Sequence, residues 1–200
     1  MSLRLLLTIS LRGDAGKKGA IMRAGTDGQK LYMKECEPLN FDDMATMLAS
    51  LRAEMLETRK NGGLVILEER TGNLLPGCFD RLIDLNSSSP LGGAWFERAL
   101  DHFQQLNTIG GIVVPEQAMH MFQVSQEDLD VRMGDGGKTV YKVNPDSFGP
   151  EKRCLMLGVL GVCVQDSSDP HYLKELYKDT STPDPQSNMI MSIVNHVAGR

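Results

Sequence analysis

The 200-residue chain has no hydrophobic run long enough to cross a membrane. A spanning helix needs about 20 consecutive apolar residues, whereas the apolar start Leu5–Ile9 lies between Arg4 and Arg12. This start also lacks the small-residue cleavage site of a secretory signal peptide. We therefore expect a cytoplasmic protein that has no membrane partner.

Cysteine and histidine are sparse and show no ligand spacing. The chain has four residues of each type and no Cys-x-x-Cys pair, so neither a disulfide framework nor a zinc site is indicated. We expect the cysteines to be buried, reduced thiols, and the isolated histidines to have surface or core roles. These residues are Cys36, Cys78, Cys154 and Cys163, and His102, His120, His171 and His196.

Several nucleotide-binding and hydrolase motifs are also missing. Gly13, Gly16 and Gly19 are spaced three apart, which does not match Gly-x-Gly-x-x-Gly, and no Gly-x-x-x-x-Gly-Lys-Ser/Thr loop occurs. The Gly-x-Ser-x-Gly turn of serine hydrolases is absent. These absences exclude the common dinucleotide, P-loop and α/β-hydrolase classes.

Basic residues are fewer than acidic ones: 21 Lys and Arg stand against 26 Asp and Glu, and the formal net charge is −5. This balance argues against a protein that coats nucleic acid by bulk electrostatics, because such domains are usually basic. It does not exclude an enzyme that acts on DNA, because metal-binding carboxylates lower the total charge while a local basic strip still meets phosphates.

The hydrophobic content, 41% of the chain, is enough for one ordinary domain with a core. After Asp166 the composition shifts toward Ser, Asp, Pro and Thr. We expect a domain over residues 1–165 and a C-terminal extension with short helices over residues 166–200. The apolar face from Met189 to Val197 either packs back on the domain or forms a dimer contact.

Hydrophobic patterning predicts an α/β chain that opens with an antiparallel meander. The aliphatic run 3–12 predicts a strand, and strands over 18–23 and 30–34 flank a turn at Asp27-Gly28. Apolar residues at helical spacing then run from Met44 to Met55. We expect Asn40 to cap this helix, with Asp42 and Asp43 in its first turn, and Asn61-Gly62-Gly63 to end it.

The second half alternates strands and helices. The all-apolar run 64–67 predicts a central strand, and residues 71–90 a long loop with a helical turn at 79–85. The remaining predicted elements are a helix over 91–105 with Trp95, Ala99 and Phe103 on one face, a strand over 109–114, a helix over 116–122, a polar segment over 125–147 containing a strand at 139–143, and a buried helix over 151–164 that Pro150 opens.

Two acids follow strand ends. Asp14 lies in a glycine turn after the first strand, and Glu68 ends the run 64–67. Alone, Asp14 is typical of a turn former and Glu68 of a solvated strand end. Together they suggest carboxylates that share divalent metal ions. Lys17 and Lys18 are either solvent-facing turn residues or phosphate contacts.

These segments resemble a known family. The run from Asp14 to Ile21 is similar to the Asp-Pro-Gly-x-x-Gly-Ala-Ile opening of phage and bacterial RuvC-like Holliday junction resolvases, of the ribonuclease-H-like superfamily, with Ala15 in place of proline. Val65–Glu68 resembles that family's second motif, an aliphatic strand ending in glutamate. Leu91–Trp95 and Val113–Gln117 resemble later segments, and the resemblance covers roughly residues 5–165 in order.

The resemblance implies a ribonuclease-H-like mixed sheet, with its first three strands antiparallel and helices on both faces. It also implies a Mg²⁺-dependent (or Mn²⁺-dependent) endonuclease that hydrolyses branched DNA by two-metal catalysis, a step in DNA recombination. On this reading Asp14 bridges the metals and Glu68 binds one. The partners would be branched DNA and a second copy of the chain, in the cytoplasm of a bacterial or phage-infected cell.

The final motif departs from the family. Arg153 stands where an acid is expected in the last helix, so Glu151, or Asp146 one loop earlier, would have to complete the site. Two alternatives therefore accompany the resolvase hypothesis. One is a terminase-type or other nuclease of the same fold, and the other is a degenerate nucleic-acid-binding or structural protein.

Overall fold

The computed structural model describes residues 3–11, 18–40, 43–89, 94–122, 128–133, 139–144 and 146–163. The chain divides into two compact units. The first comprises the described residues up to 122 together with Phe148–Cys163, and it contains the large sheet. The second includes a hairpin of β7 (Leu129–Met133) and β8 (Thr139–Val143).

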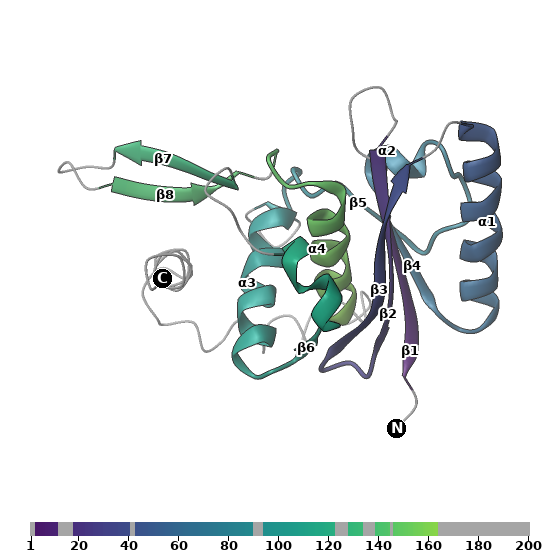
Figure 1. Cartoon of the computed structure of the whole chain (residues 1–200), viewed down its shortest axis with the longest axis horizontal. Helices are drawn as coiled ribbons and strands as arrows, with labels where there is room; N and C mark the ends of the chain where they lie inside the picture. Colours follow the sequence, from purple (N-terminus) through teal and green to yellow (C-terminus); the bar gives the residue numbers. More distant parts are fainter. Residues whose placement is uncertain are drawn as a thin grey trace. The chain divides into compact units, whose positions relative to one another are not determined.

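A mixed six-stranded sheet forms the centre of the first unit (Figure 1). Its order is β5-β4-β1-β2-β3-β6. Strands β1 to β3 pair antiparallel, while β4 runs parallel to β1, β5 parallel to β4, and β6 parallel to β3. The predicted mixed sheet with an antiparallel start is thus confirmed. The bounds are β1 Arg4–Ser10, β2 Lys18–Thr26, β3 Leu31–Asn40, β4 Leu64–Glu68, β5 Arg81–Ile83 and β6 Ile112–Val113.

The turn between β2 and β3 lies where the sequence predicts it. Gly28 has φ of 91°, a left-handed conformation that glycine adopts without strain. The Asp27 carboxylate accepts hydrogen bonds from the backbone N–H groups of Gln29 and Lys30 at 2.9 and 2.8 Å. Strand β2 extends beyond its predicted end to Thr26, and β3 extends to Asn40, because the pairing of the two strands runs from Thr26 and Leu31 to Lys18 and Asn40.

Helix α1 (Met44–Lys60) packs on one face of the sheet. Its cap is Asp43, whose carboxylate accepts from the backbone N–H groups of Ala45 and Thr46. The prediction of Asn40 as cap is wrong, because β3 pairing continues to Asn40. The predicted glycine end is confirmed, since Gly62 has φ of 74°.

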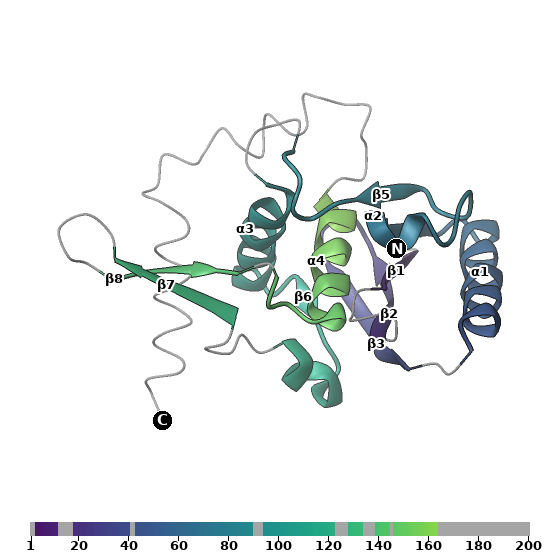
Figure 2. The same cartoon turned by 90° about the horizontal axis from the view of Figure 1, so that it is seen from above.

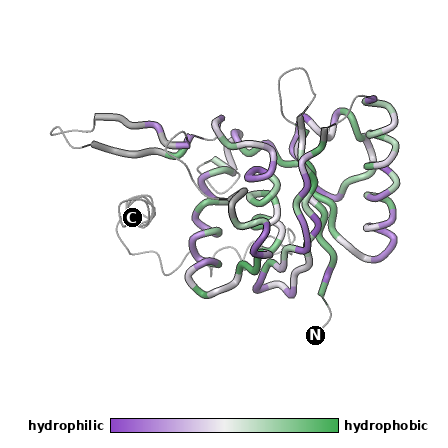
Figure 3. The backbone as a smooth tube through the Cα atoms, viewed as in Figure 1, coloured by the Kyte–Doolittle hydropathy of each residue, from purple (hydrophilic) through white to green (hydrophobic). Residues whose placement is uncertain are grey.

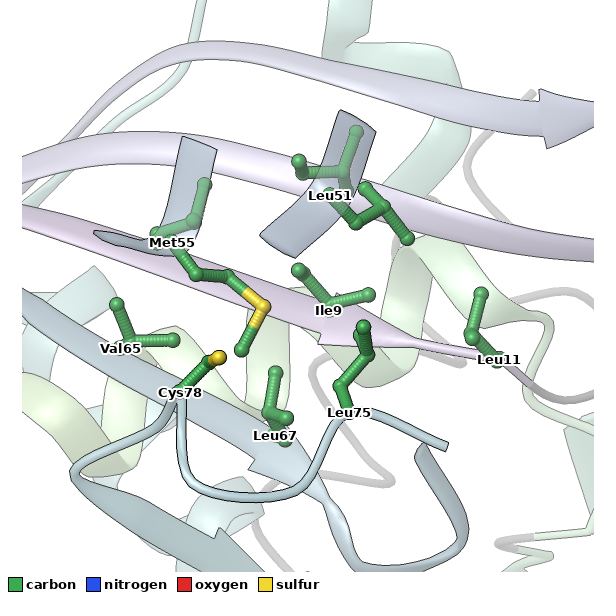
Figure 4. Close-up of a cluster of buried hydrophobic side chains, with 10 residues drawn as sticks. Ile9, Leu11, Leu51, Met55, Val65, Leu67, Leu75 and Cys78 are labelled. Atoms are coloured by element: carbon green, nitrogen blue, oxygen red, sulfur yellow. The ribbon is translucent and has the colours of Figure 1, made fainter. Parts of the chain in front are cut away.

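The core beneath α1 is apolar (Figure 4). Leu51 and Met55 of the helix pack on alternate residues of β1 and β4, and Figure 3 shows hydrophobic stretches along these strands. Because strand side chains alternate between faces, the intervening residues point to the opposite layer. The cluster also contains Leu7, Ile9, Leu11, Ile21, Val65, Leu67, Leu75 and Cys78.

Helices α3 (Trp95–Thr108) and α4 (Pro150–Cys163) form the layer on the other face (Figures 1 and 2). Glycine allows α4 to approach the sheet closely, since a Cβ added at Gly161 would lie 2.8 Å from Ile66 Cδ1. Phe148, just before α4, packs edge-on against Phe96 of α3, with ring centroids 5.1 Å apart.

The buried face of α3 differs from the predicted one. Of the predicted stripe Trp95, Ala99 and Phe103, only Ala99 is buried. Phe96 takes the central position, because contact with Phe148 places that side of the helix inward. Leu100, His102 and Leu106 complete the buried face.

The segment after β4 also departs from prediction. Instead of a helical turn at 79–85, the chain forms the short helix α2 (Glu69–Gly72) and then β5. The Asp80 carboxylate accepts a hydrogen bond from Val65 N at 2.9 Å, which holds the chain beside β4. Tertiary pairing with the open edge of β4 therefore overrides the local sequence signals.

Other predicted elements are present with changed extents. Strand β6 is shorter than the predicted 109–114, and residues Glu116–Phe122 form a 3₁₀ helix. The strand predicted at 139–143 is β8, and β7 forms within a segment expected to be polar and irregular. The predicted extension 166–200 lies outside the described residues. In the described part of the chain, no helix has both the length and the apolar character of a membrane span.

Candidate functional site

Ser10 and Glu68 lie side by side at the ends of two parallel strands. The β1–β4 register pairs Ile9 with Leu67, so the next residues along each strand are Ser10 and Glu68. Both are buried. Ser10 Oγ donates a hydrogen bond to Glu68 Oε2 at 2.5 Å. Since Ile9 and Leu67 belong to the core under α1, these two polar side chains point to the α4 face.

Arg153, in the first turn of α4, is the third member of this group. Its Nε donates to Glu68 Oε1 at 2.8 Å, and its Nη2 donates to the same oxygen. The side chains of Arg153 and Glu68 are only 1% and 5% exposed, so this is a buried ion pair. The group of Ser10, Glu68 and Arg153 is called the buried triad below.

Buried polar contacts continue along β1 from the triad. Thr8 Oγ donates to the backbone oxygen of Cys154 at 3.0 Å, and the Cys154 thiol approaches the Ala20 backbone oxygen at 3.3 Å. On the other side, Leu11 N donates to Thr71 Oγ at 2.8 Å. These contacts fix the first turn of α4 and the start of α2 against the strand ends.

The thiols in this region are protonated at neutral pH. Burial is the main cause that raises the pKa of the Cys154 thiol well above its usual value. Burial also raises the pKa of the Cys36 thiol to about 12, and the carboxylates of Glu151 and Glu37 add to this shift. Neither thiol has the lowered pKa that a cysteine nucleophile needs.

Glu151 lies on the β3 side of α4, away from Glu68. Residues two apart on a helix do not share a face, and Glu151 acts electrostatically on Cys36 of β3, whereas Arg153 contacts Glu68 of β4. In the sheet order these strands are three positions apart, about 14 Å at normal strand spacing. In the described part of the chain Glu68 is bound by Ser10 and Arg153, and Glu151 is not among its contacts.

The other predicted site residues have different positions. Asp14 and Lys17 lie outside the described residues, and Lys18 is described only as the first residue of β2. Asp146 is exposed in the second unit, where its N–H donates to Asn144 Oδ1 at 2.9 Å. Glu68 is the one predicted acid that the structure places at the carboxyl ends of β1 and β4.

The sequence pointed to some members of the buried triad and not to others. Arg153 is the last charged residue before the apolar remainder of α4, and it is the departure that the family resemblance exposes. Ser10 was not predicted. The sequence feature that marks it is a hydroxyl at the end of the mainly aliphatic run of β1.

The residues present fit a metal centre only in part. A carboxylate oxygen is the ligand type that Mg²⁺ prefers, and Glu68 supplies one. Its Oε1 is already bound by the Arg153 guanidinium, and its Oε2 by Ser10. Among the described residues, no group of three or more His, Cys, Asp or Glu side chains is arranged to hold a metal ion. The buried triad by itself does not fit a two-metal centre.

No protein-family model matches this chain, and no curated protein sequence matches it either. Solved structures do. The large terminase nuclease from thermophilic phage G20c is 14% identical with a TM-score of 0.50, and the match covers 78% of this chain and 81% of that one. The same nuclease with bound magnesium is 13% identical with a TM-score of 0.50, covering 78% and 80%.

At this level of identity the similarity shows the fold. The chain has the ribonuclease-H-like fold that large terminase nuclease domains share: a mixed sheet that begins with an antiparallel meander and carries helices on both faces. Similarity to the RuvC-like resolvases in particular is not among these findings.

Proposed function

We propose that the chain is an endonuclease of the ribonuclease-H-like fold that hydrolyses phosphodiester bonds in DNA. The main support for this proposal is the position of Glu68, whose carboxylate lies at the carboxyl ends of the two central parallel strands. Beyond this end of β1 the chain enters residues 12–17, which contain Asp14. Fold similarity to a terminase nuclease supports the proposal by analogy.

Mg²⁺ is the proposed cofactor. Asp14 and Glu68 are its proposed ligands, with Glu151 or Asp146 as the third acid. When bound, such an ion would activate water and neutralise charge on the phosphate. Glu151 is the better third candidate, because it lies in the first turn of α4. Lys17 and Lys18 are proposed to contact phosphates.

A terminase-type activity on duplex DNA now stands ahead of junction resolution as the proposed reaction, because the similar solved structures are terminase nucleases. Junction resolution by a homodimer stays a proposal. The two differ in substrate, since a resolvase introduces paired nicks in a four-way junction and a terminase-type nuclease cuts linear duplex.

The test compares linear duplex, a flap and a synthetic four-way junction, each with Mg²⁺, Mn²⁺, Ca²⁺ or chelator. Mg²⁺- or Mn²⁺-dependent cleavage by the wild type that Asp14→Asn abolishes, with DNA binding retained, is the expected result. Lys60→Ala is a matched control, because Lys60 ends α1 just before the start of β4, and Glu68 is at the other end of that strand. Cleavage that persists in Asp14→Asn would refute the assignment.

A second candidate is a DNA-binding or structural protein that does not cleave. Two observations favour it: the residue beside Glu68 on β1 is Ser10, and the residue facing it from α4 is Arg153. Among the described residues, a hydroxyl and a cation thus bind the two oxygens of Glu68. Binding of DNA without cleavage under every metal condition above would select this candidate.

A further inference from the structure

The charges of the buried triad cancel. Glu68 contributes one negative charge, Arg153 one positive charge and Ser10 none. Both ionised side chains are almost completely buried. A buried carboxylate needs a compensating charge, because the desolvation of an unpaired ion is severely unfavourable. Arg153 supplies that charge from within the protein.

The Arg153 guanidinium also occupies the lone pairs of Glu68 Oε1 that a metal ion would need. Arg153 Nε and Nη2 both donate to Oε1, which uses the two lone pairs of that oxygen. A divalent cation at Oε1 would have to displace both hydrogen bonds. It would also lie next to a positive charge, whose repulsion is strong where solvent is excluded.

The backbone that carries Arg153 is not free to withdraw. The contact of Gly161 with Ile66 and Leu6 seats α4 directly on β1 and β4. Thr8 further binds the carbonyl of Cys154, the residue after Arg153. Release of Glu68 therefore depends on rotation of the Arg153 side chain and not on movement of the helix.

We infer that Arg153 is a built-in counter-ion that takes the place of a metal ion at Glu68, and that a divalent cation must displace it to bind Oε1 of that carboxylate. This inference rests on the proposed function in that Glu68 is a proposed metal ligand. It adds that the protein folds with this carboxylate neutralised without metal, and that Arg153 limits metal affinity.

The test measures thermal unfolding of the full chain with and without Mn²⁺, in the wild type, Arg153→Gln and Arg153→Lys. Removing the guanidinium is expected to lower the midpoint in the absence of metal, because Glu68 loses its counter-ion. Mn²⁺ should then raise the midpoint of Arg153→Gln, with an apparent affinity about tenfold or more above that of the wild type. Arg153→Lys keeps the charge but loses the two-donor contact, so its midpoint without metal should lie between those of the wild type and Arg153→Gln, and its Mn²⁺ response should stay as weak as that of the wild type.

Two controls isolate the site. The double variant Glu68→Gln/Arg153→Gln removes both charges and should show no Mn²⁺ response, while Arg70→Gln removes an exposed arginine from neighbouring α2 and should leave the wild-type response unchanged. If Arg153→Gln folds only when Mn²⁺ is present, the inference is likewise supported. An equal Mn²⁺ shift in wild type and Arg153→Gln, or failure of Arg153→Gln to respond or fold with Mn²⁺ while the double variant folds, would overturn it.

The outcomes separate this inference from the proposed function. A wild type that cleaves DNA with Mg²⁺ but has the same Mn²⁺ affinity as Arg153→Gln would keep the function and remove the counter-ion role. An Arg153→Gln variant that gains Mn²⁺ binding, in a protein that never cleaves, would keep the counter-ion role and remove the function.

Discussion

Glu68 and Arg153 are 85 residues apart in the chain, and they meet as an ion pair with almost no exposed side-chain surface. Such a pair contributes little net stability relative to apolar residues of similar volume, but removing one partner leaves an uncompensated charge. The buried triad is therefore a place where single and double substitutions should differ sharply.

Glu68→Gln is expected to lower the free energy of unfolding by about 3 kcal/mol, because it breaks the buried ion pair between Glu68 and Arg153. Adding Arg153→Met should recover a large part of this loss. Urea denaturation of the wild type, the single variant and the double variant measures both changes. A double variant less stable than the single one would contradict the argument.

At this scale the sequence was a partial guide. Glu68 was predicted as a strand-end acid, and the structure places it there. Its partners could not be predicted in the same way. The Ser10 contact depends on strand register, and the Arg153 contact depends on how α4 crosses the sheet. Neither is encoded in local spacing.

Helix α1 shows how a terminal residue controls an element. Asp43 accepts from the Thr46 hydroxyl and from the N–H groups of Ala45 and Thr46, and these bonds lower the pKa of its carboxyl. A carboxyl whose pKa is lower in the folded state adds stability above its unfolded pKa. That contribution disappears as the pH falls through the folded value.

Asp43→Ala should therefore lower the thermal midpoint at pH 7, whereas Asp43→Asn, which keeps a cap acceptor, should lower it less. The difference in thermal midpoint between the wild type and Asp43→Asn should become smaller as the pH falls from about 4 toward 2, because Asp43 becomes protonated in this range. Circular dichroism melts across that pH range check this. A gap that widens at low pH would show that the cap carboxylate is not the cause.

Helix α4 depends on small residues where it meets the sheet. A Cβ at Gly161 would crowd Ile66 Cδ1 and Leu6 Cδ1, while a Cβ at Gly158 would meet the flexible end of Met22. Gly161→Ala is expected to destabilise the protein by about 1–3 kcal/mol, and Gly158→Ala by less, because Met22 can rotate away. Chemical denaturation of both variants checks the ranking. If Gly161→Ala and Gly158→Ala were equally stable, α4 could move away from the sheet to accommodate the added methyl group.

Element positions were predictable where the hydrophobic period was long. The patterns of α1 and α4 and the run of β4 gave their ranges closely. Strand β5 could not be predicted, because it exists through pairing with β4 and the Asp80 contact. The inward face of α3 likewise depends on Phe148, which lies 52 residues away from Phe96 in the sequence (148 − 96).

On the scale of the whole molecule, the negative net charge opposes the proposed binding to DNA, which is also negatively charged. A formal charge of −5 leaves no general attraction for phosphate. Binding would have to depend on a few local lysines, of which Lys17 and Lys18 are the proposed ones. Their contribution is visible in the dependence of affinity on salt.

The variant Lys17→Ala/Lys18→Ala should weaken binding of duplex DNA and reduce the slope of log affinity against log salt by about 2, one unit for each lost phosphate contact. Lys60→Ala should leave the slope unchanged, since Lys60 precedes the start of β4, at the opposite end of that strand from Glu68. Fluorescence anisotropy at several salt concentrations measures the slopes. A change for Lys60→Ala of equal size would show that binding is nonspecific.

The alternation of β4 has a consequence for how the chain finds its fold. Leu67 belongs to the apolar core under α1, and Glu68 meets Arg153 on the opposite face. A one-residue slip of β4 along β1 would turn Glu68 toward Leu51 and Met55 and leave Arg153 without its carboxylate. Misaligned pairings are therefore penalised on both faces at once, so the charged pair selects the correct alignment of the two central strands during folding.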